Sequence, residues 1–199
     1  MLTLFHAPQS RSSRIIWLLE ELGATYEIAY TNITRMDGSG AADPANPHPD
    51  KKVPALAHDG ALVTESIAII LYLTDLHPEA GLGPRVGDPR RGAYLSWLAY
   101  YAGVVEPVIN FEHAKVADNP ALVRTFRGRA ELDARITGAL AKSEYLLGDG
   151  FSAVDLLFAS VGQWYRSGLP PGERVDRYLA ACSSRPAAAR AMAKDKPPA

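Results

Sequence analysis

Residues 51–73 read KKVPALAHDGALVTESIAIILYL, and this stretch combines a hairpin signal with a helix signal. Two short apolar runs, Val53–Ala57 and Ala61–Val63, flank the tripeptide His58-Asp59-Gly60. An Asp-Gly pair between apolar runs predicts a β-hairpin, because both residues tolerate the positive φ angles of a tight turn. The stretch therefore predicts two antiparallel strands followed by a helix.

The helix is predicted to begin at Thr64-Glu65-Ser66. Apolar residues follow at helical spacing on two adjacent faces: Ile67, Ile70 and Leu71, then Ile69, Tyr72, Leu73 and Leu76. A helix that is apolar around so much of its circumference packs against a sheet. Its N-terminus keeps free backbone N–H groups and a partial positive charge, so it attracts a carboxylate, and the Ser66 hydroxyl adds a donor.

Pro54 lies at the start of the first predicted strand. Proline cannot donate a hydrogen bond to a sheet, so it belongs at a strand start or on an edge strand. One interpretation is an ordinary edge proline. The other is a cis Val53–Pro54 bond, which would turn the Val53 amide outward and leave it free for a ligand. The dipeptide alone leaves both open.

The chain begins with a predicted β-α-β unit. A strand is expected over Leu2–Phe5, a helix over Ile15–Leu22 that stops at Gly23, and a strand over Tyr26–Ala29. Parallel strands joined in this way need a right-handed crossover. Together with residues 51–73, the order becomes β-α-β-loop-β-β-α, which is a thioredoxin-like arrangement over residues 1–77.

The second half of the chain is predicted to be helical. Residues 78–89 are rich in Gly and Pro and indicate a linker, so residues 90–199 form an expected all-α domain. Helices are expected over residues 90–110 with a kink near Pro107, over 121–147 with a break near Gly138, and over 174–182 and 186–193. Residues 194–199 are expected to form a disordered tail.

Three segments resemble the cytosolic glutathione transferases. V-P-A-L with a D-G hairpin and E-S-I-A-I resembles their glutathione site, and residues 48–54, HPDKKVP, resemble the family segment H-P-x-G-K-x-P. Residues 8–23, PQSRSSRIIWLLEELG, resemble a bacterial and fungal subgroup whose first helix starts S-R-S-x-R. The resemblance implies a cis proline, a homodimer, and glutathione-binding residues His48, Lys52, Val53, Pro54, Glu65 and Ser66. One departure is visible, because Lys51 replaces the usual glycine.

Glutathione brings its own sulfur nucleophile, and only the thiolate attacks well. A hydroxyl near the N-terminus of the first helix can donate to that anion. Ser10 is the first hydroxyl after the first strand, and the resemblance implies that it is the catalytic serine. The residues alone leave a second interpretation, a loop serine or a helix N-cap, which Ser12 or Ser13 also fits.

Two groups in the helical half have competing interpretations. The resemblance implies that Tyr100, Tyr101 and Val104 line an electrophile pocket, whereas their spacing is also typical of core packing. Ser152 and Asp155 have capping-box spacing before an apolar run, which predicts a structural role worth about 1 kcal/mol. Asp155 is therefore not expected to act as a catalytic acid.

Composition bounds the function classes. The chain has 199 residues, 47% of them hydrophobic, and a formal net charge of −1. This charge gives no electrostatic reason to expect binding to nucleic acid or to an anionic membrane.

The sequence predicts a cytoplasmic location. The first residues lack the pattern of a secretory signal, and no apolar run is long enough to span a membrane. Cys182 is the single cysteine, so no internal disulfide is possible, which is typical of a reducing compartment. No Cys/His cluster has metal spacing, so no metal is expected.

The expected function is a glutathione transferase that joins the glutathione thiolate to small hydrophobic electrophiles, with peroxidase activity toward organic hydroperoxides as a further expectation. A glutathione-dependent thiol reductase is disfavoured, because that chemistry needs a cysteine and the N-terminal half has none. A non-catalytic glutathione-binding or interaction protein on the same fold remains the alternative.

Overall fold

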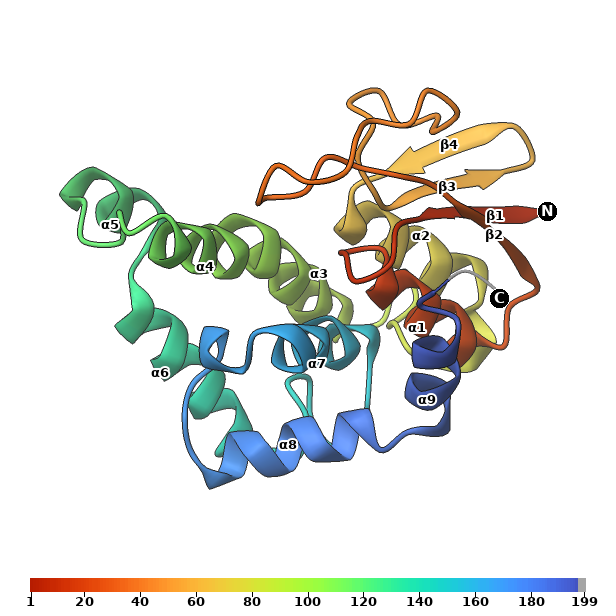
Figure 1. The fold of residues 1–199 in the computed structure, drawn as a ribbon. Helices are drawn as coiled ribbons and strands as arrows, with labels where there is room; N and C mark the ends of the chain where they lie inside the picture. Colours follow the sequence, from red (N-terminus) through yellow and green to blue (C-terminus); the bar gives the residue numbers. More distant parts are fainter. Residues whose placement is uncertain (197–199) are drawn as a thin grey trace. The chain divides into compact units, whose positions relative to one another are not determined.

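The computed structural model describes residues 1–196, which group into two compact units. The first unit contains residues 1–82 and 184–196, and the second contains Gly83–Ser183 (Figure 1). The expected boundaries were 1–77, 78–89 and 90–199. The difference lies at the C-terminal end, since the last helix groups with the first unit and not with the other helices.

The first unit contains a four-stranded mixed sheet. Its strands are β1 (Leu2–His6), β2 (Tyr26–Tyr30), β3 (Ala55–His58) and β4 (Ala61–Thr64), in the order β2-β1-β3-β4. β1 and β2 are parallel, and the other two pairs are antiparallel. The predicted hairpin is confirmed, with Asp59 and Gly60 at φ 48° and 87° in a two-residue turn between His58 and Ala61.

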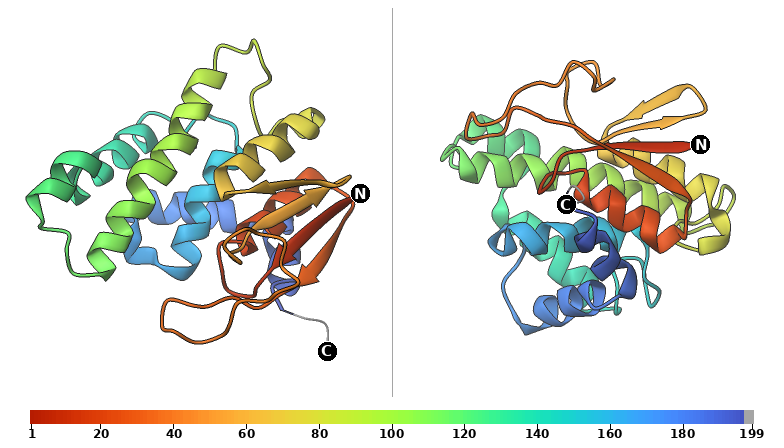
Figure 2. Two further views of the ribbon diagram at one scale, coloured as in Figure 1. Left: turned by 90° about the horizontal axis from the view of Figure 1, so that it is seen from above. Right: turned by 45° about the vertical axis from the view of Figure 1, so that its right-hand side comes forward.

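Three helices and a short 3-10 turn complete this unit. They are α1 (Ser13–Leu22), α2 (Ser66–Leu76), η1 (Pro78–Ala80) and α9 (Pro186–Ala193). α1 ends at Gly23, which adopts the left-handed conformation at φ 63°. α1 contacts both α2 and α9, and Figure 2 shows α9 beside α1 in both views. The thioredoxin-like prediction for this unit is confirmed.

The contact between α1 and α9 depends on buried acids of α1. Glu21 accepts hydrogen bonds from Arg185 Nε at 2.7 Å and Nη2 at 2.8 Å, and Glu20 accepts from Arg190 Nε at 2.7 Å. Both carboxylate side chains are less than 10% exposed. Charge-assisted bonds at low exposure are stronger than surface ion pairs, and they explain why α9 belongs to the first unit.

The second unit is all-helical, as predicted. Its elements are α3 (Arg91–Tyr100), a π-helical segment η2 (Tyr101–Val105), α4 (Glu106–His113), α5 (Pro120–Phe126), α6 (Arg129–Leu140), α7 (Ala153–Trp164), the 3-10 turn η3 (Arg166–Gly168) and α8 (Glu173–Ser183). α7 is buried from Ala153 to Val161 and forms the centre of this unit.

The predicted irregularity near Pro107 is confirmed. The π-helical segment η2 ends two residues before Pro107, which lies in the first turn of α4, and α4 continues to His113. The second predicted helix has a break that was not predicted, at Arg127, where φ is 68°. It ends at Leu140, two residues after Gly138 and short of the expected end at residue 147. Gly128 starts α6 by donating its N–H to the Glu131 carboxylate at 3.1 Å, so a cap decides the boundary.

Candidate active site at one edge of the sheet

The pairing register of the sheet brings together, at one end of its strands, the three segments that resemble glutathione transferases. Phe5 pairs with Ala55, and Ala55 pairs with Thr64. The loop that follows β1, the residues that precede β3 and the residues that follow β4 therefore meet at the same end of the sheet. Ser10, Pro54 and Glu65 belong to these three segments, although they are far apart in the sequence.

The Val53–Pro54 bond is cis, and both residues are buried. This is the arrangement that the resemblance implied. Pro54 immediately precedes β3 and so needs no ladder hydrogen bond. β3 is an inner strand, so Pro54 is not an edge-strand proline: it precedes the strand, and its peptide bond is cis.

Lys51 adopts the conformation that the missing glycine would supply. Its φ is 54°, in the left-handed region, and its Nζ donates to the carbonyl oxygens of Asn46 at 2.7 Å and Pro44 at 3.3 Å. Lys52 is exposed, and its own carbonyl accepts from Asn46 Nδ2 at 2.9 Å. The Lys51 ammonium group is thus used within the loop, and binding of glutathione by the exposed Lys52 stays a prediction.

His48 is buried within this same loop. Its Nδ1 accepts from the Asp50 N–H at 3.0 Å, and its own N–H donates to Asn46 Oδ1 at 3.0 Å. Both contacts lie within the loop that carries Lys52, and the role of His48 in glutathione binding stays a prediction.

Glu65 and Ser66 lie at the N-terminus of α2. Ser66 is the first helical residue and is half-buried, and Glu65 precedes it with φ 70° and ψ 124°. A positive φ in a non-glycine residue costs free energy, and such conformations cluster at ligand sites. The helix start offers backbone N–H groups to an anion, with the exposed Glu65 carboxylate beside it to pair with a cation.

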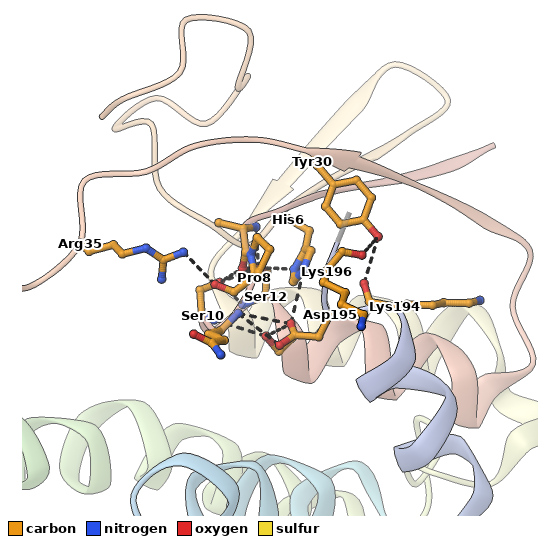
Figure 3. Close-up of polar contacts among 12 residues, drawn as sticks. His6, Pro8, Ser10, Ser12, Tyr30, Arg35, Lys194, Asp195 and Lys196 are labelled. Carbon is orange, nitrogen blue, oxygen red and sulfur yellow. Dashed lines mark hydrogen bonds and ion pairs between the residues drawn. The ribbon is translucent and has the colours of Figure 1, made fainter. Parts of the chain in front are cut away.

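Ser10 lies in the loop between β1 and α1, and its side chain is half-buried. Its Oγ lies 2.7 Å from the Ala7 carbonyl oxygen and 2.7 Å from Ser12 Oγ, and it accepts the Ser12 N–H at 3.2 Å (Figure 3). Ser12 occupies the N-cap position of α1, but its side chain makes no capping hydrogen bond. The part of Ser10 in catalysis stays a prediction.

Sequence reasoning missed three residues around Ser10. His6 and Asp195 contact the serines, and Arg35 Nη2 donates to the Pro8 carbonyl oxygen at 2.9 Å. His6 could have been found from the sequence, because a histidine at the end of an apolar strand is a candidate for a functional site. Asp195 could not have been found in this way, because residues 194–199 were expected to be a disordered tail. That expectation was wrong for residues 194–196, and residues 197–199 lie outside the described part.

Tyr100, Tyr101 and Val104 are buried within the second unit. The Tyr101 ring meets Phe158 edge-on at 5.4 Å, and its hydroxyl donates to Glu106 Oε1 at 3.2 Å. Arg135 stacks over the Tyr100 ring at 3.9 Å. Two cavities of this unit, of about 550 and 310 Å³, are lined by none of the three residues. Their place in an electrophile pocket stays a prediction.

Asp155 is fully buried at the start of α7 and accepts four hydrogen bonds. The donors are the N–H and Oγ of Ser152, the N–H of Leu146 and the hydroxyl of Tyr178, at 2.8 to 3.1 Å. Burial raises the pKa of Asp155, and these hydrogen bonds oppose that rise. Its contacts are those of a capping box extended to the preceding loop and to α8.

Among residues 1–196, no group of three or more His, Cys, Asp or Glu side chains could hold a metal ion. No helix in the same range is long and apolar enough to cross a membrane. Cys182 is buried in α8, in the unit that lacks Ser10.

The chain is similar to known proteins in sequence and in structure. Residues 1–75 match the family described as the glutathione S-transferase N-terminal domain. A curated relative, glutathione S-transferase 3 of Schizosaccharomyces pombe, is 28% identical over 94% of this chain and 85% of its own.

Solved structures extend the likeness over nearly the whole chain. A glutathione transferase from Methylococcus capsulatus has a TM-score of 0.77 and 27% identity, with 98% of both chains covered. A sphingomonad glutathione S-transferase solved with glutathione has a TM-score of 0.76 and 25% identity over 97% of this chain and 98% of its own.

Proposed function

We propose that this chain, whose residues 1–75 belong to the glutathione S-transferase N-terminal domain family, joins the thiolate of glutathione to small hydrophobic electrophiles. The enzyme class is that of the glutathione S-transferases, and glutathione is its co-substrate. The finer parts of the proposal are the electrophile class, a peroxidase activity toward organic hydroperoxides, a cytoplasmic location, and membership of the S-R-S-x-R subgroup.

The observation that carries the proposal is the sheet register. It brings Ser10, the cis Val53–Pro54 pair and the start of α2 to the same end of the sheet. In the proposed complex, Glu65 and Ser66 bind the γ-glutamyl end, which has both an ammonium and a carboxylate. Val53 pairs with the peptide backbone, Lys52 binds a carboxylate, and Ser10 faces the sulfur.

In this reaction the protein has to stabilise the thiolate anion of glutathione. Moving the thiol pKa down by about two units requires about 2.7 kcal/mol. A hydrogen bond to a charged group contributes about 1.5–3 kcal/mol, and the α1 N-terminus adds a favourable partial charge. Ser10 at the start of α1 therefore accounts for the shift without any cysteine.

Steady-state assays with glutathione test the proposal, using an aryl halide for conjugation and cumene hydroperoxide for peroxidase activity. Turnover of the aryl halide supports the transferase. Tight glutathione binding by calorimetry without turnover of either substrate would instead support the non-catalytic alternative. A thiol reductase would turn over a mixed disulfide, which we do not expect because Cys182 is buried in the second unit.

A further inference from the structure

A continuous polar chain leads from Ser10 into the interior of the first unit. Ser10 Oγ lies 2.7 Å from Ser12 Oγ, and Ser12 Oγ lies 2.8 Å from His6 Nδ1. On the far side of the ring, His6 Nε2 lies 3.3 Å from Asp195 Oδ1. His6 and Ser12 are completely buried, whereas Ser10 is half-buried, so the chain connects the surface to a buried imidazole (Figure 3).

Asp195 is held in place from several directions. Its carboxylate accepts the Gln9 N–H at 3.2 Å and the Ser13 hydroxyl. The residues on either side of it are fixed by Tyr30, whose hydroxyl lies 3.0 Å from the Lys194 carbonyl oxygen and 2.9 Å from that of Lys196. The C-terminal segment therefore returns to the loop that carries Ser10.

The surroundings of His6 favour a neutral ring that can take up a proton. Ser12 of α1 and Tyr30 of β2, whose ring meets the imidazole edge-on at 5.6 Å, are uncharged, and Asp195 is the charged group that faces it. Burial lowers the pKa of His6, and the nearby Asp195 partly raises it. His6 Nε2 has no hydrogen-bond partner despite complete burial. A neutral ring that carries its proton on Nε2 leaves Nδ1, which faces Ser12, free to accept one, and the resulting imidazolium would form an ion pair with Asp195.

We propose that Asp195, His6, Ser12 and Ser10 form a proton relay that takes the proton of the glutathione thiol, an inference that rests on the proposed function. The S–H proton passes to Ser10 Oγ as the Ser10 proton passes to Ser12 Oγ and the Ser12 proton passes to His6 Nδ1. The thiol loses one proton, His6 gains one, and both hydroxyls are unchanged. Ser10 ends with its O–H directed at the thiolate, and the imidazolium lies between Ser12 and Asp195.

In this arrangement His6, Ser12 and Asp195 are positioning residues, since Ser10 alone faces the sulfur. A relay and a purely through-space interaction predict opposite changes in the thiol pKa when Asp195 is removed. A negative charge near a thiolate disfavours it, so removing Asp195 would lower the thiol pKa if the two groups interacted only through space. In the relay, Asp195 stabilises the imidazolium, so its removal raises the thiol pKa.

The test is the ultraviolet thiolate band of the glutathione complex of the full chain, followed against pH. Thiol with neutral His6 and thiolate with imidazolium hold the same number of protons, so as the pH falls the wild-type band should pass through a plateau at a non-zero value. It should fall further only where a second proton converts the pair to thiol with imidazolium. In Asp195→Asn and Ser12→Ala the band should instead fall about tenfold for each pH unit below the thiol pKa. Their kcat/KM near pH 6.5 should fall at least about tenfold.

One control separates the relay from packing. Asp195→Glu keeps the carboxylate and should restore the plateau that Asp195→Asn loses. A wild-type band without a plateau, or an Asp195→Asn band that keeps it, would overturn the relay while leaving the transferase proposal intact. Failure of the wild type to bind glutathione in calorimetry would overturn both.

Discussion

At the scale of single residues, Ser10 has the most direct part in the proposed chemistry. Its hydroxyl is half-buried at the start of α1, within 2.7 Å of another hydroxyl. In Ser10→Ala the pKa of bound glutathione should rise toward its free value, so the thiolate band should weaken near neutral pH. Turnover should fall roughly ten- to a hundredfold, since about 1.5–3 kcal/mol is lost.

Two measurements decide whether the effect of Ser10→Ala is local. Glutathione affinity in calorimetry should change little, because the tripeptide is bound at its other end. Ser10→Cys places a thiol at the same position and should gain mixed-disulfide chemistry. A thiolate titration of Ser10→Ala that overlays the wild type would move the role to another donor.

Glu65 and Ser66 should determine affinity instead. Both lie at the N-terminus of α2, which is suited to the charged γ-glutamyl end. Glu65→Ala and Ser66→Ala should each weaken glutathione binding by about 1.5–3 kcal/mol in calorimetry, with a smaller effect on turnover at saturating glutathione. Unchanged affinity in both variants would show that glutathione does not bind at this helix.

At the scale of elements, the start of α7 depends on one buried carboxylate. Asp155 accepts four hydrogen bonds, so Asp155→Ala leaves several buried donors without a partner. The free energy of unfolding should fall by about 2–4 kcal/mol in urea titrations. Glu131→Ala is the matched control, because Glu131 caps α6 while exposed and should cost about 1 kcal/mol or less. A stable but inactive Asp155→Ala would instead point to a catalytic role.

The contact between α1 and α9 should weaken in acid. Burial alone would raise the pKa of Glu20, but hydrogen bonds from Lys194, Tyr26 and Arg190 outweigh burial and lower it from 4.5 to about 2. A lowered pKa means that the folded state prefers the carboxylate, so this stability is present above about pH 4.5 and is lost as the pH falls toward 2. The contribution is at most about 3 kcal/mol.

Urea unfolding between pH 6 and pH 3 tests the acid effect. The wild type should lose stability over this range, and Glu20→Gln should lose less, because it has no carboxylate to protonate. Parallel curves for the two proteins would show that the contacts of Glu20 do not contribute to the pH dependence.

At the scale of the whole molecule, we predict a homodimer. The motive is the resemblance to a family of dimers together with likeness to transferase structures over nearly the full chain. Light scattering at micromolar concentration should give about twice the chain mass of 21.5 kDa. A mass equal to one chain would contradict the prediction.

Features with short-range causes were determined by the sequence itself. The Asp59-Gly60 turn, the stop of α1 at Gly23 and the cap formed by Ser152 and Asp155 depend on residues a few positions apart. The resemblance added the cis bond at Pro54 and the fold of the first unit. In each case the physical preference belongs to the residues named, so it can be recognised without the tertiary structure.

Features that join distant segments were decided only by the tertiary structure. The break at Arg127, next to the cap between Gly128 and Glu131, was not predicted, although α6 does end two residues after Gly138. Gln9 and Asp195 are 186 residues apart in the sequence, and nothing in a polar C-terminal segment indicates that it packs beside His6. That contact exists because α9 docks on buried acids of α1, and such docking depends on packing and burial that no local pattern encodes.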